Sequence, residues 1–268
     1  MSLSTTFLTR AQTARIRNLF RDKRARQTDG AFIVEGAKPV RDLLLTHPTH
    51  VQMLVVASGY QQRESDRDRL LRHSVDVPTY GCLDRSFAAL SGLETPQGIL
   101  AIVQQPCWNE DELLERPVLF GLFGEQLQDP ANVGAIIRTA AALNVSALWL
   151  TPESADIYNP KVVRATSGAL LSLPIFVARD VTRFIQNHCA IYAAEVAGPD
   201  TVEMEAIHTI PRRVILAMGN ESRGLSESTR QQATCRFTIP LTRQVESLNV
   251  AATAAIAMYY FGRLPKES

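Results

Sequence analysis

Five polar side chains in the C-terminal half follow apolar runs of sequence, where a bound molecule could meet them. They fall in three segments, 129–140, 214–226 and 239–255. Amides, a guanidinium, a carboxylate and a hydroxyl can together orient a polar substrate, offset charge and handle a proton. These candidate residues are Asn132, Arg138, Glu221, Ser247 and Asn249.

Each segment also has a purely structural explanation when it is taken alone. Arg138 lies off the apolar stripe of a predicted helix, where an arginine is commonly at the surface or in an ion pair. Residues 219–224 begin and end with glycine and could form an ordinary turn. Ser247 is a natural N-cap. Asn249, expected inside the first helical turn, is harder to explain because asparagine is a poor helix former.

Strands and helices alternate over residues 118–264, which predicts a doubly wound α/β domain. Several of the strands are almost continuous apolar runs, a pattern typical of a parallel sheet covered on both faces. Ligands bind beyond the carboxyl ends of such strands, so the three segments follow strands where a site is expected. The predicted strands span 118–123, 147–150, 175–177, 191–195, 214–218 and 236–239, and the predicted helices span 133–143, 160–170, 181–188 and 249–261.

Residues 1–103 form a separate predicted α/β unit. Its expected helices span 11–26, 38–45, 63–72 and 84–91, and its expected strands span 31–34, 53–57 and 98–103. The stretch 104–117 holds two prolines among polar residues and is the predicted linker.

The net charge is only +1, but basic residues cluster near the N-terminus. Such a cluster is the electrostatic footprint expected for a polyanion, and a solvated helix face is an equal alternative. Between residues 10 and 26 there is one acid, Asp22, and seven basic residues: Arg10, Arg15, Arg17, Arg21, Lys23, Arg24 and Arg26.

The chain gives no sign of a metal site or a membrane span. Its four cysteines have no paired spacing and its five histidines include no HxxxH pair, which is consistent with free thiols in a reducing compartment. The longest apolar stretch, 250–261, is too short to cross a bilayer. No signal peptide is predicted, and we expect a cytoplasmic protein.

Taken in order, the three segments resemble the signature motifs of the SpoU (TrmH-like) family. The matching stretches read DPANVGAIIRTA, MGNESRGLS and IPLTRQVESLNVAATAAI, with NPKVVRATSGA and Leu173-Pro174 between the first and second. Members of this family are S-adenosylmethionine-dependent RNA ribose 2′-O-methyltransferases of the SPOUT class. The first half resembles the family's accessory RNA-binding domain, through FIVEG at 32–36 and TPQGILA at 95–101.

The resemblance implies an α/β fold in two domains. The C-terminal SPOUT domain would contain a parallel sheet and a deep trefoil knot, an exception to the rule that chains are unthreaded. The N-terminal domain would have a ribosomal-protein-like α/β/α fold. The implied division is 1–103 for the accessory RNA substrate-binding domain, 104–117 for the linker and 118–268 for the catalytic domain.

The resemblance also assigns a cofactor and residue roles. S-adenosylmethionine would be held largely through backbone groups, by Met218, Gly219, Asn220, Glu221, Thr238, Ile239, Leu241, Ser247 and Leu248. Arg138 would act first as a clamp on the RNA phosphate and an electrostatic activator of the 2′-hydroxyl, because an arginine rarely loses its proton; whether it takes the proton itself stays open. Asn132, Ser247 and Asn249 would position the ribose, and Glu221 would fix its loop or Arg138.

The expected substrate is RNA, because only RNA carries the 2′-hydroxyl. Family members with the accessory domain mostly act on large-subunit ribosomal RNA, so ribosomal RNA is the expected partner. No metal is needed, because the sulfonium charge already activates the methyl group. A homodimer is expected through the helix over 249–261, whose small residues permit close packing.

Two other functions stay open: ribose methylation of transfer RNA, and a catalytically idle RNA-binding or ribosome-assembly factor. A dinucleotide-dependent oxidoreductase is set aside because no GxGxxG follows a predicted strand. The sequence also departs from the family in two places. The stretch 241–245 lacks the usual glycine, and Ala251-Ala252-Thr253 replaces the common Ser-Val-Ala.

Overall fold

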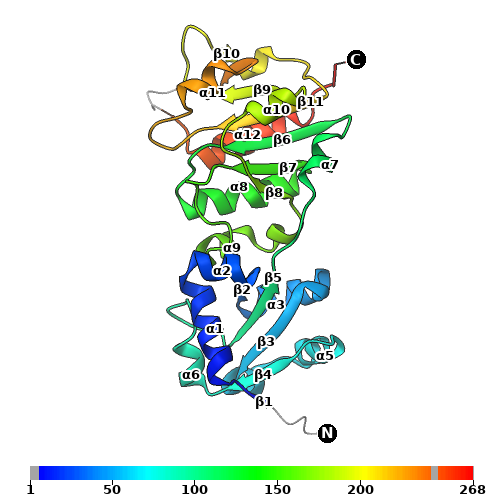
Figure 1. Cartoon of the computed structure of the whole chain (residues 1–268), viewed down its shortest axis with the longest axis vertical. Helices are drawn as coiled ribbons and strands as arrows, with labels where there is room; N and C mark the ends of the chain where they lie inside the picture. Colours follow the sequence, from blue (N-terminus) through cyan, green and yellow to red (C-terminus); the bar gives the residue numbers. More distant parts are fainter. Residues whose placement is uncertain (1–5, 243–246, 268) are drawn as a thin grey trace. The chain divides into compact units, whose positions relative to one another are not determined.

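The computed structural model describes residues 6–242 and 247–267. The chain divides into two compact units (Figure 1). Unit 1 comprises Met1–Cys107 and Asp156–Leu171, and unit 2 comprises Trp108–Ala155 and Ser172–Ser268. The chain therefore passes from one unit to the other three times.

Unit 1 is a five-stranded mixed sheet with helices on both faces. The sheet order is β1-β4-β3-β5-β2, and β5 runs antiparallel to both of its neighbours. Helix α1 and the α6 region cover one face of the sheet, where they bury Ile16, Leu19, Phe87 and Leu90. Helices α3 and α5 pack together on the other face. The strands are β1 (Thr6–Phe7), β2 (Ala31–Glu35), β3 (Val51–Ala57), β4 (Thr79–Cys82) and β5 (Ile99–Gln104). The helices are α1 (Arg10–Arg21), α2 (Lys23–Asp29), α3 (Ala37–Thr46), α4 (Ser58–Arg63), α5 (Asp66–Ser74) and α6 (Asp84–Ala88).

The basic helix predicted over 11–26 is two helices, because the chain breaks at Asp22. That residue adopts an extended conformation (φ −117°, ψ 119°), and its backbone amide closes α1 on the carbonyl of Asn18. Its carboxylate then accepts the amide of Arg24 and caps α2. A single acid within a basic run therefore sets the break.

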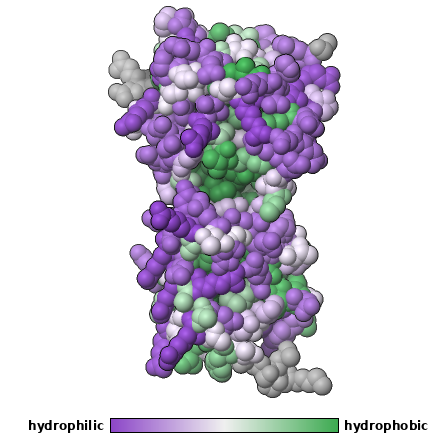
Figure 2. Space-filling view, in the orientation of Figure 1, coloured by the Kyte–Doolittle hydropathy of each residue, from purple (hydrophilic) through white to green (hydrophobic). Residues whose placement is uncertain are grey.

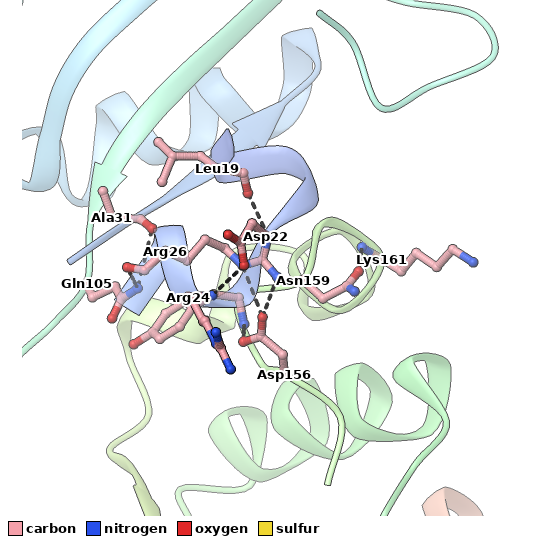
Figure 3. A network of polar contacts seen from close by, with 10 residues as sticks. Leu19, Asp22, Arg24, Arg26, Ala31, Gln105, Asp156, Asn159 and Lys161 are labelled. Atoms are coloured by element: carbon pink, nitrogen blue, oxygen red, sulfur yellow. Dashed lines mark hydrogen bonds and ion pairs between the residues drawn. The ribbon is translucent and has the colours of Figure 1, made fainter. Parts of the chain in front are cut away.

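The segment Asp156–Leu171 belongs to unit 1, although the sequence predicted 118–268 as one domain. Its helix α9 (Pro160–Thr166) packs on β2, and the ring of Tyr158 lies 5.0 Å from that of Phe32. A buried ion pair fixes the start of the segment (Figure 3). Arg26 of α2 donates from Nε (3.0 Å) and Nη2 (2.5 Å) to Oδ2 of Asp156, and from Nη1 to the carbonyl of Leu19 (2.7 Å).

Unit 2 is a seven-stranded sheet in the order β10-β12-β9-β11-β6-β7-β8, and its paired strands are all parallel. Side chains from α7 and α10 join the core on one face, and α8 and α12 pack together on the other. This arrangement confirms the predicted α/β fold with a parallel sheet, and the trefoil knot stays a prediction. The strands are β6 (Leu119–Gly124), β7 (Ala147–Leu150), β8 (Ile175–Val177), β9 (Ala190–Ala194), β10 (Val202–Glu203), β11 (Arg213–Met218) and β12 (Cys235–Thr238). The helices are α7 (Glu110–Leu114), α8 (Pro130–Ala142), α10 (Thr182–Gln186), α11 (Glu227–Gln231) and α12 (Val250–Phe261).

The linker is shorter than the predicted 104–117. Residues 110–114 form α7, and Leu113 and Leu114 are buried in the core of unit 2. Glu110 ties this helix to the core, because its carboxylate accepts the indole N–H of Trp149 (2.7 Å). Only the residues around Cys107 connect the two units at this crossing.

Candidate active site

The candidate site lies at the carboxyl edge of the parallel sheet in unit 2. The first segment follows β6, the second follows its neighbour β11, and the third follows β12, separated from β11 only by β9. Parallel strands end at the same edge, so three segments far apart in the sequence are brought to one side of the sheet. Part of the third segment, residues 243–246, lies outside the described residues.

The start of α8 turns Asn132 toward the interior. Asp129 caps the helix by accepting the amide of Ala131 (2.8 Å), and Pro130 occupies the first turn, where its missing amide costs nothing. This start places Asn132 in the first turn with only 8% of its surface exposed.

Asn132 joins the three segments by hydrogen bonds. Its Nδ2 donates to Oε1 of Glu221 (3.0 Å), in the loop after β11. Its Oδ1 accepts from Nδ2 of Asn249 (2.9 Å), at the start of α12. Three of the five predicted site residues therefore form one chain of side chains, Glu221–Asn132–Asn249.

Asn249 has a clear structural role that the sequence analysis gave to Ser247. Asn249 is the N-cap of α12, because its Oδ1 accepts the amides of Ala251 (2.9 Å) and Ala252 (3.4 Å). The prediction that Ser247 caps this helix is wrong, since the helix begins at Val250. Ser247 is exposed and lies two residues before the cap.

The loop after β11 is a compact turn around two glycines. The amides of Asn220 and Gly224 each donate to the other's carbonyl (3.0 and 2.9 Å), and Gly224 has a φ of 69°. A Cβ on Gly219 would come within 2.2 Å of the backbone of Gly224, so no other residue fits there. This close approach explains the glycine pair in structural terms.

The side chain of Asn220 is used inside the protein. Its Nδ2 donates to the carbonyl of Gln126 (2.8 Å), and its Oδ1 accepts the amides of Ser222 (3.0 Å) and Arg223 (3.1 Å). Asn220 therefore ties the loop after β11 to the loop after β6.

Glu125 is a site residue that the sequence analysis missed. It directly follows β6, is 8% exposed, and its amide donates to the carbonyl of Met218 (2.8 Å). Its Oε2 accepts the amide of Ser226, the N-cap of α11 (3.1 Å). The carboxylate thus holds the far end of the 219–225 loop. A charged residue immediately after a buried apolar strand was the signal available in the sequence.

Arg138 is not part of the Glu221–Asn132–Asn249 chain. It lies six residues after Asn132 on α8, which is roughly 9 Å along the helix axis. Its side chain is exposed and forms no ion pair or hydrogen bond with the residues that the structure describes. Glu221, expected to fix its loop or Arg138, bonds to Asn132 and so ties its loop to α8.

The residues expected to hold S-adenosylmethionine lie at the ends of β11 and β12. Met218 and Thr238 are buried, whereas Leu241 is 40% exposed and Ile239 and Leu248 are half-buried. Within residues 6–242 and 247–267, the amides of Ile239, Leu241 and Leu248 have no hydrogen-bond partner. Free backbone donors beside accessible apolar side chains suit a nucleoside, with its flat base and polar edges. The donor set therefore fits this cofactor.

The basic cluster is partly used within unit 1. Arg26 is buried against Asp156, and Arg15 pairs with Asp29 (2.6 Å) and also donates to Gln52. Because the Asp29 carboxylate accepts its hydrogen bond, the pKa of Arg15 is raised further. The remaining members, Arg10, Arg17, Arg21, Lys23 and Arg24, are exposed.

The described ranges, 6–242 and 247–267, lack a metal-binding cluster and a membrane-spanning helix. They contain no group of three or more His, Cys, Asp or Glu side chains placed to hold a metal ion. None of the helices in the same ranges is long and apolar enough to cross a membrane.

Residues 120–259 match the SpoU rRNA Methylase family, and residues 13–101 match the MRM3-like substrate binding domain. The chain is 29% identical over 241 residues to the Bacillus subtilis 23S rRNA (guanosine(2553)-2′-O)-methyltransferase RlmP, covering 89% of this chain and 91% of that protein. It is 28% identical over 250 residues to the 23S rRNA (uridine(2479)-2′-O)-methyltransferase of Streptomyces viridochromogenes, covering 90% and 84%.

A solved structure has the same fold over nearly the whole chain. The AdoMet-bound rRNA methyltransferase from Sinorhizobium meliloti matches with a TM-score of 0.78 and 26% identity, covering 96% of this chain and 95% of that one. The family match spans more than half of the chain and includes all three segments that meet at Asn132. This protein belongs to the SpoU rRNA methylase family.

Proposed function

We propose that this protein transfers a methyl group from S-adenosylmethionine to a ribose 2′-hydroxyl of RNA, and that its substrate is large-subunit ribosomal RNA. The observation that carries the proposal is the Glu221–Asn132–Asn249 chain of hydrogen bonds (3.0 and 2.9 Å). It joins the three segments at the edge where a parallel sheet binds ligands.

The cofactor and the RNA class are supported by the relatives. Two curated relatives are named 23S rRNA 2′-O-methyltransferases, and they match over at least 89% of this chain. The similar Sinorhizobium structure is described as AdoMet-bound. The amides of Ile239, Leu241 and Leu248, which have no partner among the described residues, fit the same cofactor. A ribosomal substrate would place the protein in the cytoplasm.

S-adenosylmethionine would supply a methyl group already activated by the positive sulfonium, and it would leave as S-adenosylhomocysteine while the hydroxyl proton passes to solvent. The task left to the protein is to fix the approach of the ribose hydroxyl and to stabilise its developing negative charge. Asn132 can fix the approach of the hydroxyl, because hydrogen bonds to Glu221 and Asn249 hold both ends of its side-chain amide in place. Ser247 lies exposed two residues before Asn249 and completes the positioning set.

Arg138 supplies the charge. Its guanidinium is exposed, so it can act as a phosphate clamp and stabilise a nearby oxyanion. We place it toward the RNA phosphate, about 1.7 turns along α8 from Asn132.

The site is proposed to work in a homodimer joined through α12. Ala252, Ile256 and Tyr259 lie on one face of that helix at spacings of four and three residues, and all are exposed. Ile256 is 39% exposed and Tyr259 is 51% exposed. An apolar stripe of this kind on a surface helix is typical of a helix-to-helix interface.

The direct test is transfer of a radioactive methyl group from S-adenosylmethionine to purified RNA. Incubation with deproteinised large-subunit ribosomal RNA, followed by mapping of 2′-O-methyl sites, should reveal one methylated ribose. A synthetic fragment with a 2′-deoxy nucleotide at that position should accept nothing, because the attacking hydroxyl is gone.

Other outcomes would contradict the proposal. Methylation of transfer RNA with none of ribosomal RNA would overturn the substrate, and methylation of a base would overturn the chemistry. Binding of RNA without binding of S-adenosylmethionine in a calorimetric titration would indicate an idle RNA-binding factor.

A matched pair of variants tests the Asn132 chain. Asn132→Asp keeps the shape but replaces the donor toward Glu221 with a second carboxylate, so the two like charges should separate the segments. We expect turnover to fall by about 100-fold or more, as for other misplaced catalytic groups. Asn109→Asp, at the exposed N-cap of α7, should leave turnover unchanged, because the carboxylate can still accept the amide of Glu112.

A further inference from the structure

Among the described residues, unit 1 contains a hollow that the methyl-transfer site does not use. It is a surface pocket of about 630 Å³, within the range of roughly 300 to 1,000 Å³ typical of small-ligand sites. It lies where the parallel strands β1 and β4 end and α1 meets α6. Its lining includes Phe7, Leu83, Arg17 and Arg85.

The pocket combines exposed apolar side chains with positive charge. Phe7 is 67% exposed and Leu83 is 48% exposed, although both are large hydrophobic residues. Gly81 lies opposite Phe7 in the strand pair and contributes no side chain beside the ring. Figure 2 shows hydrophobic and hydrophilic residues interspersed over the end of unit 1 where Figure 1 labels β1 and α6.

Two arginines supply the charge, and no acid lines the pocket. Arg17 and Arg85 are exposed, and neither forms an ion pair within the described part of the chain. Aromatic rings and guanidinium planes are the groups on which unstacked bases lie in single-stranded RNA recognition, and arginine also binds phosphate. The pocket therefore suits a base attached to a phosphate.

The pocket continues into a stripe of arginines along α1. Arg10, Arg17 and Arg21 are spaced by seven and four residues, which places them within about 40° of one another around the helix. They lie roughly 10 Å and 6 Å apart along its axis. All three are exposed, and the sequence of α1 contains no acid. Arg15, which pairs with Asp29, lies on a different side of the helix.

We propose that this pocket binds one unstacked nucleotide of a single-stranded RNA segment, with the flanking phosphates along the Arg10–Arg17–Arg21 stripe. The proposal rests on the proposed function, because it takes the substrate to be RNA. Phe7 and Leu83 contact the base, and Arg17 and Arg85 contact the phosphate. Unit 1 thus selects RNA that offers an unpaired base, which a continuous duplex cannot.

The test uses the full chain and a fluorescein-labelled, 15-nucleotide single-stranded RNA of mixed sequence, with binding followed by anisotropy. The variant Arg17→Ala/Arg85→Ala removes both pocket charges. The matched control, Arg67→Ala/Arg116→Ala, removes two exposed arginines away from the pocket. For single-stranded nucleic acid, the slope of log K against log salt concentration changes by about 0.7 for each phosphate contact. The slope of the pocket variant should therefore be about 1.4 shallower than that of the wild type, and the slope of the control should be unchanged.

A second pair of variants tests the base contact. Phe7→Ala should weaken binding by roughly 5- to 150-fold, the range for loss of a base-stacking aromatic, and Phe7→Tyr should restore it. RNA that contains 4-thiouridine should photo-crosslink to the peptide that carries Phe7 or Leu83. These residues are exposed, so the variants should unfold at the wild-type temperature.

The outcomes separate this inference from the proposed function. If the pocket and control variants bind RNA equally while the wild type still methylates ribosomal RNA, the inference is wrong and the function stands. If the crosslinks map to the pocket but no RNA accepts a methyl group, the function is wrong and the pocket stands. Equal affinity for the RNA and for a fully paired duplex of the same sequence would also overturn the inference.

Discussion

Removing the guanidinium of Arg26 should destabilise unit 1 far more than removing an exposed arginine. The side chains of Arg26 and Asp156 are 4% and 14% exposed, and three hydrogen bonds engage the guanidinium. Breaking a buried pair leaves one charge uncompensated and costs about 3–5 kcal/mol. We therefore expect Arg26→Met, which keeps the length of the apolar stem, to lower the free energy of unfolding by that amount.

A matched control uses the exposed pair Arg69–Asp66, whose side chains are 52% and 85% exposed. Such pairs contribute about 0–1 kcal/mol, so Arg69→Met should shift unfolding by less than 1 kcal/mol. The double variant Arg26→Met/Asp156→Asn should recover most of the loss, because no charge is then left buried and the asparagine oxygen can still accept the amide of Tyr158.

The assay is urea unfolding followed by circular dichroism, with hydrogen exchange of peptides from residues 156–171 to locate the change. A loss of about 3 kcal/mol corresponds to exchange that is more than about 100-fold faster in that segment. Unchanged exchange there, together with a shift below 1 kcal/mol in the unfolding of Arg26→Met, would refute the reasoning.

Three other expectations follow from exposed and buried groups elsewhere. Arg138→Ala should abolish methyl transfer while leaving calorimetric S-adenosylmethionine binding nearly intact, and full turnover would rule out the role given to Arg138. Ile256→Asp on α12 should convert a dimer into a folded monomer in sedimentation, whereas a wild-type monomer at micromolar concentration would contradict the dimer. Burial raises the pKa of Cys82 to about 11. Its alkylation at pH 8 should therefore be much slower than that of the exposed Cys107, and should rise with pH toward 11; equal rates by mass spectrometry would contradict the burial.

The sequence predicted the buried strands of unit 2 closely. Strands β7 and β8 have the predicted bounds, because a short apolar run between turns has few other ways to be buried. The short strands β1 and β10, only two residues each, were missed, and so was β4. The two-residue strands β1 and β10 carry too few residues for a pattern to form, and the sequence of β4, TYGC, is not an apolar run.

The candidate site was predicted in outline only. Placing three segments after parallel strands correctly brought Asn132, Glu221 and Asn249 together. The sequence could not distinguish Ser247 from Asn249 as the cap, because both residue types cap helices and two residues separate them. It could not reveal the role of Glu125, which depends on a contact 101 residues away with Ser226.

Domain boundaries were the weakest part of the prediction. Helix α9 packs on β2, and the Arg26–Asp156 pair joins residues that are 130 positions apart. Local periodicity reports which face of a helix is apolar, but not which sheet that face covers.

The docking of Asp156–Leu171 on unit 1 has a practical consequence for anyone who wishes to cut the gene. A fragment encoding residues 108–268 would carry α9 without β2, and Val162, Val163 and Leu170, all buried here, would face water. A fragment ending at residue 107 would lack α9 and would expose the apolar surface of β2 that α9 covers. Single-domain expression should therefore yield aggregates, and a clean excision would need a short bridge from Ala155 to Ser172 that omits the docked segment.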